Sequence, residues 1–156
     1  MTELEAFIIK YLDIDKSKYK DLKKNTFVYD FLFLWSLFEQ NVFKGFCKIQ
    51  TIIEKKELNE KVLENIEEDI KYFFNRYQNK KYYKNLVWNN SNQYFENILN
   101  KNYENLSHTE KTHFILFVVF RFRNNIFHGN KGIQSWLKYN EQIEKCVKIM
   151  IRLLDN

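Results

Sequence analysis

Apolar residues recur at intervals of three and four along most of this 156-residue chain. Such spacing gathers apolar side chains on one side of an α-helix. The pattern predicts helices over residues 3–13, from 25 or 26 to about 56, 59–78, 92–103, 107–129 and 134–154. In the second and longest of these, the expected core positions are Phe27, Phe31, Leu34, Trp35, Phe38, Val42, Phe46, Ile49 and Ile53.

Polar residues mark the helix ends and the segments between helices. Asn25 and Thr26 are both suitable N-caps for the long second helix. Ser107, with Glu110 three residues later, has the spacing of a capping box. We expect the lysine-rich segment 16–24 to be a connection, and the basic, amide-rich segment 79–92 to be irregular.

The composition favours a single helical domain. The chain has no proline and three glycines, so little interrupts long helices, and its hydrophobic content of 45% suffices for a core. No internal repeat or linker divides it. We therefore expect one all-α domain over residues 1–156, an up-and-down bundle of four to five helices. Residues 1–25 would form an N-terminal helix and a basic connection.

Charge and cysteine content narrow the function classes. The formal net charge of +5 favours a polyanionic partner. Cys47 and Cys146 are widely separated and indicate neither a disulfide scaffold nor a metal site, so we expect no metal and no cofactor. The acidic N-terminus lacks a secretion signal, and no uncharged apolar run approaches the roughly 20 residues of a membrane span. The sequence thus predicts a cytoplasmic protein without a membrane partner.

The segment from Arg123 to Gly129, Arg-Asn-Asn-Ile-Phe-His-Gly, carries the strongest chemical signal. It follows the apolar run 113–122, so it sets an arginine, two amides and a histidine where the chain is expected to be buried. Arginine stays charged at any working pH, and histidine titrates near neutrality. A guanidinium can hold a phosphate and an imidazole can move a proton, as metal-free RNA cleavage requires. Gly129 would let the chain leave the helix at once.

Helical geometry leaves open which arginine is the partner of His128. Asn124 lies four residues before His128 and Arg121 lies seven before it, so both share its face. Arg123 is five residues away and points elsewhere in a straight helix. Either Arg121 is the neighbour of His128, or Arg123 meets the histidine of a second copy or reaches it through a distorted last turn. A histidine at a helix end is also often only a capping or surface residue.

The sequence Phe122–Gly129 resembles the signature of the HEPN superfamily, in which an arginine and a histidine are separated by four to six residues, often with a polar residue after the arginine. The segment Phe33–Glu39 is similar to the aromatic early helix of several bacterial members. Helix order and chain length agree with the family over most of residues 26–154.

The resemblance implies a helical bundle that forms a symmetric dimer, in which two signatures build one composite cleft. It also implies metal-independent endoribonuclease activity, commonly in toxin–antitoxin or phage-defence systems. The family's arginine corresponds to Arg123, its polar residue to Asn124 and its histidine to His128. Arg121, with six intervening residues, is an alternative within the family's range.

Supporting roles fall to residues near the signature. Arg121 and Asn125 need hydrogen-bond partners in so apolar a helix, since unpaired buried polar groups are costly. They either line a polar interface or face a ligand. Glu39 pairs with Arg121 or Arg123, or else belongs to a solvated face with nearby lysines.

A second candidate surface interleaves basic and aromatic residues between Lys71 and Trp88. Single-stranded RNA is bound in this way, with stacking worth roughly 1–3 kcal/mol per base. The alternative is that Phe73 and Phe74 are core, the tyrosines line its edge and the lysines are solvated. The candidate RNA-binding residues are Arg76, Lys80, Lys81, Tyr82 and Lys84.

Three functions follow from these observations. The first is a homodimeric endoribonuclease that cuts single-stranded RNA. The second is a non-catalytic HEPN interaction subunit that partners a nucleotidyltransferase or a cognate antitoxin through the same polar segment. The third is a nucleotide-binding sensor. His108 and His113 are five residues apart and do not share a face, so we expect structural roles for both and no metal.

Overall fold

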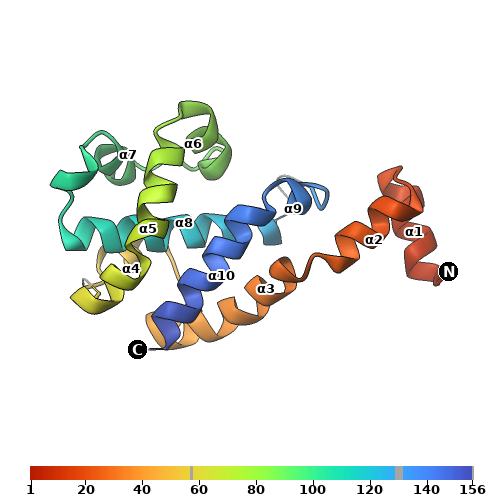
Figure 1. Cartoon of the computed structure of the whole chain (residues 1–156), viewed down its shortest axis with the longest axis horizontal. Coiled ribbons are helices and arrows are strands. Elements are labelled where there is room, and N and C mark those ends of the chain that lie inside the picture. Colours follow the sequence, from red (N-terminus) through yellow and green to blue (C-terminus); the bar gives the residue numbers. More distant parts are fainter. Residues whose placement is uncertain (57, 129–131, 156) are drawn as a thin grey trace.

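The computed structural model describes residues 1–56, 58–128 and 132–155, which form helices and no strand. The expectation of an all-helical fold is confirmed for this part of the chain (Figure 1). The α-helices are α1 Glu3–Leu12, α2 Lys16–Lys24, α3 Thr26–Phe38, α4 Ile49–Ile53, α5 Glu60–Tyr77, α6 Lys80–Val87, α7 Gln93–Leu99, α8 His108–Phe127, α9 Ser135–Lys138 and α10 Asn140–Leu154. A π-helix, Glu39–Phe43, follows α3, and a 3₁₀-helix, Tyr103–Asn105, precedes α8.

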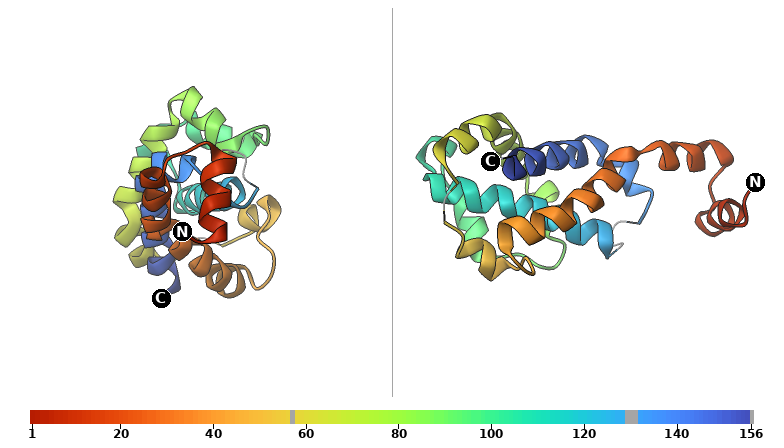
Figure 2. Two further views of the ribbon diagram at one scale, coloured as in Figure 1. Left: turned by 90° about the vertical axis from the view of Figure 1, so that its right-hand side faces the viewer. Right: turned by 90° about the horizontal axis from the view of Figure 1, so that it is seen from below.

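Four long helices, α3, α5, α8 and α10, pack together to form the core. α3 and α10 lie side by side and run in the same direction, and α8 runs antiparallel to both (Figures 1 and 2). α5 crosses α8 steeply in Figure 1. The described residues form ten α-helices rather than the expected four to five, and α5 does not align with α3, α8 and α10 as in a simple up-and-down bundle.

α8 lies at the centre of this core. All residues from Thr112 to Phe122 are buried, whereas Phe127 and His128 at its end are exposed. A helix that is apolar on all sides is stable when other elements surround it. The packing therefore encloses the middle of α8 and brings its two ends to the surface, with His128 at the C-terminal one.

The expected long helix over 26–56 is wrong, because the chain breaks after α3. The side-chain Nδ2 of Asn41 donates to the carbonyl oxygen of Leu37 at 2.7 Å, and Lys44 adopts a left-handed conformation with φ 52°. Side-chain bonds of this kind compete with helical backbone bonds. The carboxylate of Glu39 then accepts the backbone N–H of Cys47 at 2.9 Å and closes the loop. As a result, Phe46 is 79% exposed rather than part of the core.

Two segments expected to be non-helical are helices. The 16–24 segment forms α2, whose N-terminus is capped by Asp15 and whose Tyr19 and Leu22 are buried. Most of the 79–92 segment forms α6, where Oδ1 of Asn79 accepts the backbone N–H groups of Lys81 and Tyr82. In both cases an amide or carboxylate N-cap outweighs the low hydrophobicity of the segment.

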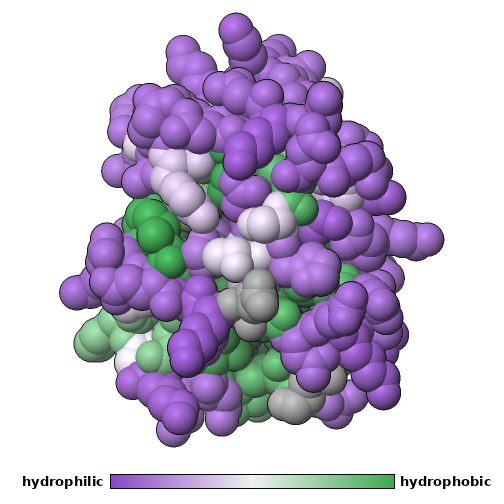
Figure 3. Space-filling model, turned by 90° about the vertical axis from the view of Figure 1, so that its left-hand side faces the viewer, coloured by the Kyte–Doolittle hydropathy of each residue, from purple (hydrophilic) through white to green (hydrophobic). Residues whose placement is uncertain are grey.

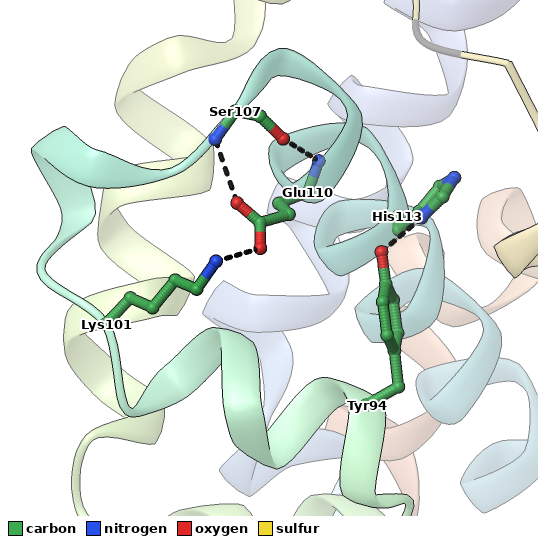
Figure 4. Close-up of polar contacts among 5 residues, drawn as sticks. All are labelled: Tyr94, Lys101, Ser107, Glu110 and His113. Atoms are coloured by element: carbon green, nitrogen blue, oxygen red, sulfur yellow. Dashed lines mark hydrogen bonds and ion pairs between the residues drawn. The ribbon is translucent and has the colours of Figure 1, made fainter.

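The predicted capping box at the start of α8 is confirmed. The hydroxyl of Ser107 accepts the N–H of Glu110 at 3.1 Å, and the carboxylate of Glu110 accepts the N–H of Ser107 at 3.0 Å (Figure 4). Asn25 occupies the N-cap position of α3, but its side chain makes no capping bond. Its Nδ2 instead donates to the carbonyl oxygen of Trp136 at 3.1 Å and ties α3 to α9.

Apolar side chains remain exposed at both ends of the molecule. α1 and α2 project from the bundle as an arm (Figures 1 and 2), and Leu4, Phe7 and Tyr11 of α1 are 63%, 60% and 76% exposed. On the opposite end, apolar side chains gather on the face that carries α4 and the end of α10 (Figure 3). No helix of the described residues combines the length and apolarity needed to cross a bilayer.

Candidate functional site

His128 lies at the C-terminal end of α8. Its backbone N–H donates to the carbonyl oxygen of Asn124 at 3.0 Å, and its side chain is exposed. Helical spacing puts the Asn124 side chain on the same face, one turn earlier. The imidazole is therefore open to a ligand beside an amide. The predicted helix stop at Gly129 lies outside the described residues.

Arg123 reaches toward this face through its side chain. Its Nη1 donates to Oδ1 of Asn124 at 2.9 Å, and its guanidinium carbon lies 4.8 Å from the ring centroid of Phe127 and 5.8 Å from that of Trp35. Two aromatic rings and one amide thus hold a half-buried guanidinium. The position of Arg123 on the helix points its side chain away from Asn124 and His128. The hydrogen bond brings one end of the guanidinium back toward the side of α8 that carries Asn124.

Arg121 has a different position. It is 3% exposed, and its Nε and Nη2 donate to the carbonyl oxygens of Leu86 and Val87 at 3.3 and 3.0 Å. Burial lowers the pKa of the guanidinium, an effect that the Tyr83 hydroxyl partly opposes. These contacts engage Arg121 with the last carbonyls of α6. Of the two arginines that the sequence left open, Arg121 is buried and engaged with backbone carbonyls, and Arg123 is half-buried.

Asn125 joins Arg121 in anchoring α6. Its Nδ2 donates to the carbonyl oxygen of Leu86 at 3.0 Å, and its side chain is 8% exposed. The orphan carbonyls of a helix C-terminus need donors, and here α8 supplies them. The predicted supporting pair, Arg121 and Asn125, consequently fixes the position of α6 relative to the signature.

Glu39 does not pair with either arginine among the described ion pairs. Its carboxylate accepts the N–H of Cys47, so both the predicted pairing and the solvated-face alternative miss its role in the loop. Burial raises the pKa of the Cys47 thiol to about 12, with a further increase from Glu39 and a decrease from Arg123. Glu39 thus shapes the loop beside Arg123 through the backbone rather than by a salt bridge.

The basic and aromatic candidates occupy the end of α5 and all of α6. Lys80, Lys81 and Lys84 are exposed, and the guanidinium carbon of Arg76 lies 4.4 Å from the ring centroid of Tyr82. Phe73 and Phe74 are core residues, as the alternative interpretation held. Because Arg121 and Asn125 anchor α6 to α8, this surface and the signature belong to one rigid unit.

His113 is a structural residue, as expected. Its buried ring accepts at Nδ1 from the Tyr94 hydroxyl and donates from Nε2 to the carbonyl oxygen of Lys55, both at 2.7 Å (Figure 4). These contacts place the ring between α7, α8 and the segment after α4. His108 is exposed at the start of α8. The described residues hold no group of three or more histidine, cysteine and acidic side chains suited to a metal ion.

A narrow cavity beside the signature was not foreseen from the sequence. Its walls come from α5, α6, α8 and the region from α9 to α10, and its volume is about 30 Å³. The lining residues are Arg76, Tyr77, Tyr82, Asn85, Leu86, Phe122, Asn125, Ile126, Ser135, Trp136, Tyr139 and Ile143. Because these residues extend from Arg76 to Ile143 in the sequence, no local pattern could have identified them together.

Comparison of this chain with protein-family models, curated proteins and solved structures finds no match in any of the three.

Proposed function

We propose that this protein is a HEPN-like, metal-independent endoribonuclease that cuts single-stranded RNA and acts as a homodimer, in a toxin or phage-defence role. The observation that carries the proposal is the hydrogen bond from Arg123 to Asn124 beside the exposed His128. An anchored guanidinium next to a titratable imidazole is the pair of groups that phosphodiester cleavage needs.

Arg123 would hold the scissile phosphate. The Asn124 amide and the faces of Trp35 and Phe127 restrain the guanidinium, so little entropy remains to be lost when a phosphate binds. Nη1 of the guanidinium bonds Asn124 and Nε is buried, so the remaining donors on the two Nη atoms would form the paired bonds that arginine makes with phosphate oxygens. Asn124 is the positioning residue for Arg123.

His128 would transfer the protons. As base, its neutral imidazole takes the proton from a 2′-hydroxyl, whose oxygen attacks the adjacent phosphorus. The bond from phosphorus to the 5′-oxygen breaks, and the leaving oxygen receives a proton from an acid. The products are a 2′,3′-cyclic phosphate and a 5′-hydroxyl. No metal takes part in this sequence of steps.

A second copy of the chain would supply the second imidazole. One imidazole cannot be base and acid at the same moment, and His113 is buried while His108 lies at the other end of α8, roughly 30 Å away for 20 residues of helix. Two copies related by symmetry bring two His128 rings to one cleft. Lys80, Lys81, Lys84 and Tyr82 would guide the RNA strand from α6.

Incubation of purified protein with total RNA in the presence of a chelator tests the proposal. Wild type should degrade the RNA, and His128→Ala should leave it intact while keeping the circular dichroism spectrum and the oligomeric state of wild type. If wild type leaves the RNA intact at every protein concentration tested, including those at which the protein is dimeric, the nuclease function is refuted.

The alternative is a non-catalytic interaction subunit that partners a nucleotidyltransferase or an antitoxin. The exposed apolar residues of α1 support it, since Leu4, Phe7 and Tyr11 are 63%, 60% and 76% exposed. If the partner binds the polar segment, as the sequence predicted, His128→Ala should abolish partner binding. If it binds α1 instead, Phe7→Ser should abolish binding while His128→Ala leaves it unchanged. No variant would cut RNA.

A further inference from the structure

The cavity between α6 and α8 has an unusual combination of apolar walls and unpartnered polar atoms. Phe122, Ile126, Trp136 and Ile143 supply apolar surface. Asn125 and Arg76 line the same cavity, and Oδ1 of the first and Nε of the second are buried with no hydrogen-bond partner within the described residues. Buried polar atoms without partners are costly, and they are rare unless a ligand or water satisfies them.

The two polar atoms present a defined donor and a defined acceptor. The Asn125 amide is oriented because its Nδ2 donates to the Leu86 carbonyl, which leaves Oδ1 as the unpartnered acceptor of this lining residue. The Arg76 guanidinium is held against the ring of Tyr82 at 4.4 Å, and its Nε–H is a donor. A ligand that satisfies both atoms must carry a donor and an acceptor of its own.

We propose that this cavity binds the edge of a nucleobase, an inference that rests on the proposed function for the source of the base. Nucleobases are planar, have apolar faces, and present N–H donors next to ring or carbonyl acceptors along one edge. The cavity has about 30 Å³ of space, enough for one or two water-sized polar groups, so only the polar atoms at one edge of a base would enter it. The exposed ring of Tyr82 at its mouth offers a stacking surface for the rest of the base.

The position of the cavity fits a base that neighbours the scissile phosphate. Asn125 follows Asn124 directly and precedes His128 by three residues, so the cavity and the candidate catalytic side chains share the last turn of α8. A strand whose base enters the cavity would have its phosphate close to this helix end. The cavity would then select the nucleotide next to the cleaved bond, and this selection would set the sequence preference of the enzyme.

Equilibrium binding of short RNA strands to the non-cleaving His128→Ala protein tests this site. Asn85→Phe, added on this background, places a ring at the cavity mouth without removing a described hydrogen bond of Asn85. Asn75→Phe is the matched control, because Asn75 is an exposed helical asparagine outside the cavity. Fluorescence anisotropy measures each protein with a labelled eight-nucleotide strand and with an abasic strand of equal length.

We expect Asn85→Phe to weaken binding of the base-containing strand about tenfold, since one stacked base contributes a factor of roughly 5 to 150 in affinity. Binding of the abasic strand should not change, and Asn75→Phe should bind both strands like its parent. Arg76→Lys, which keeps the charge but loses the planar guanidinium, should also weaken only the base-containing strand. Equal affinity of all four proteins for the base-containing strand would overturn the proposal.

Two further measurements separate this proposal from the proposed function. If the chain carrying the native His128 cuts RNA in chelator while Asn85→Phe alters neither affinity nor cleavage position, the cavity proposal fails and the nuclease stands. If it cuts no RNA but Asn85→Phe still abolishes base-dependent binding, the nuclease fails and the cavity stands. Competition by free nucleoside monophosphates shows whether the natural ligand is a free nucleotide or a base within RNA. Monophosphates that bind as tightly as the strand indicate a free nucleotide, and monophosphates that bind much more weakly indicate a base within RNA.

Discussion

The Nη1 of Arg123 donates a hydrogen bond of 2.9 Å to Oδ1 of Asn124, its neighbour in the sequence. Adjacent residues on a helix point about 100° apart, so this bond requires the long arginine side chain to bend around α8. It brings the guanidinium toward the face of His128, and Phe127 supports it from behind at 4.8 Å. The amide thus holds the guanidinium on the side of α8 from which the proposed function needs it to act with His128.

Removal of this amide should reduce catalysis and leave the fold unchanged. In Asn124→Ala the guanidinium loses its anchor, and we expect kcat/KM for RNA cleavage to fall about 10- to 100-fold, as when a positioning group is lost. The Tm should change by less than about 3 °C, since Asn124 is half-buried with a single described side-chain bond. Asn97→Ala, at an exposed asparagine of α7, is the control. Wild-type kcat/KM in Asn124→Ala would contradict the positioning role.

The two arginines should separate cleanly in stability and activity. Arg121→Ala leaves the Val87 carbonyl without its described donor and opens a cavity at the centre of the bundle, so the free energy of unfolding should fall by about 2–4 kcal/mol. Arg123→Ala should cost about 1 kcal/mol or less, because it removes a half-buried stacking contact. Urea denaturation measures both values.

Activity supplies the other half of that comparison. Arg123→Ala should remain folded and lose RNA cleavage, whereas Arg121→Lys, which keeps the charge near the α6 carbonyls, should remain active. The reverse pattern, an inactive but stable Arg121→Lys together with a fully active Arg123→Ala, would show that the assignment of the phosphate ligand is wrong.

The start of α8 should contribute a pH-dependent stability. Burial raises the pKa of Glu110, but bonds from the Lys101 ammonium and the Ser107 N–H outweigh it and lower the pKa below its ordinary value of 4.5 (Figure 4). A carboxyl with a depressed pKa stabilises the fold above its unfolded-state pKa, and this contribution disappears as the pH falls through its folded-state value.

Glu110→Gln measures this contribution. The difference in unfolding free energy between wild type and Glu110→Gln should be constant near pH 7 and shrink below about pH 4.5. Glu104→Gln, at a carboxylate that is 81% exposed, should show little difference at any pH. A Glu110→Gln difference that grows toward acid pH would contradict the assigned sign.

If the site needs an imidazole from each subunit, a dimer of one wild-type and one His128→Ala subunit should be inactive. When wild type exchanges subunits with a threefold excess of His128→Ala, random pairing leaves about a quarter of the wild-type chains in fully active dimers. RNA cleavage per wild-type chain should therefore fall to about a quarter of its initial value. An unchanged rate after verified subunit exchange would mean that each copy acts alone.

The sequence predicted those features of the fold that depend on short-range patterns. Helices α5 and α8 were predicted from apolar residues that recur within one or two turns, and the Ser107–Glu110 capping box from two residues three apart. The two helices and the capping box are confirmed. The break after α3 was missed because it depends on Lys44 in a left-handed conformation and on Glu39 bonding eight residues ahead. Neither changes the three-and-four spacing of apolar residues from which the long helix was predicted.

The sequence identified the candidate site residues, but it did not predict their hydrogen-bond partners. The bonds of Arg121 and Asn125 go to backbone carbonyls 35 and 39 residues earlier, in a segment expected to be irregular. Carbonyl acceptors have no side-chain signature, so the sequence could not distinguish the structural Arg121 from the half-buried Arg123. The bend of Arg123 toward Asn124 depends on rotamers, which helical spacing alone does not determine.

The most direct test of the central claim is the cleavage of a defined single-stranded RNA in chelator by wild type, His128→Ala and His108→Ala. The last is a matched control, because His108 is an exposed histidine at the opposite end of the same helix. Wild type and His108→Ala should cut the strand and leave 2′,3′-cyclic phosphate ends, and His128→Ala should produce no cut. An uncut strand with wild type, or cleavage by His128→Ala at the wild-type rate, would contradict the proposed role of the imidazole at the end of α8.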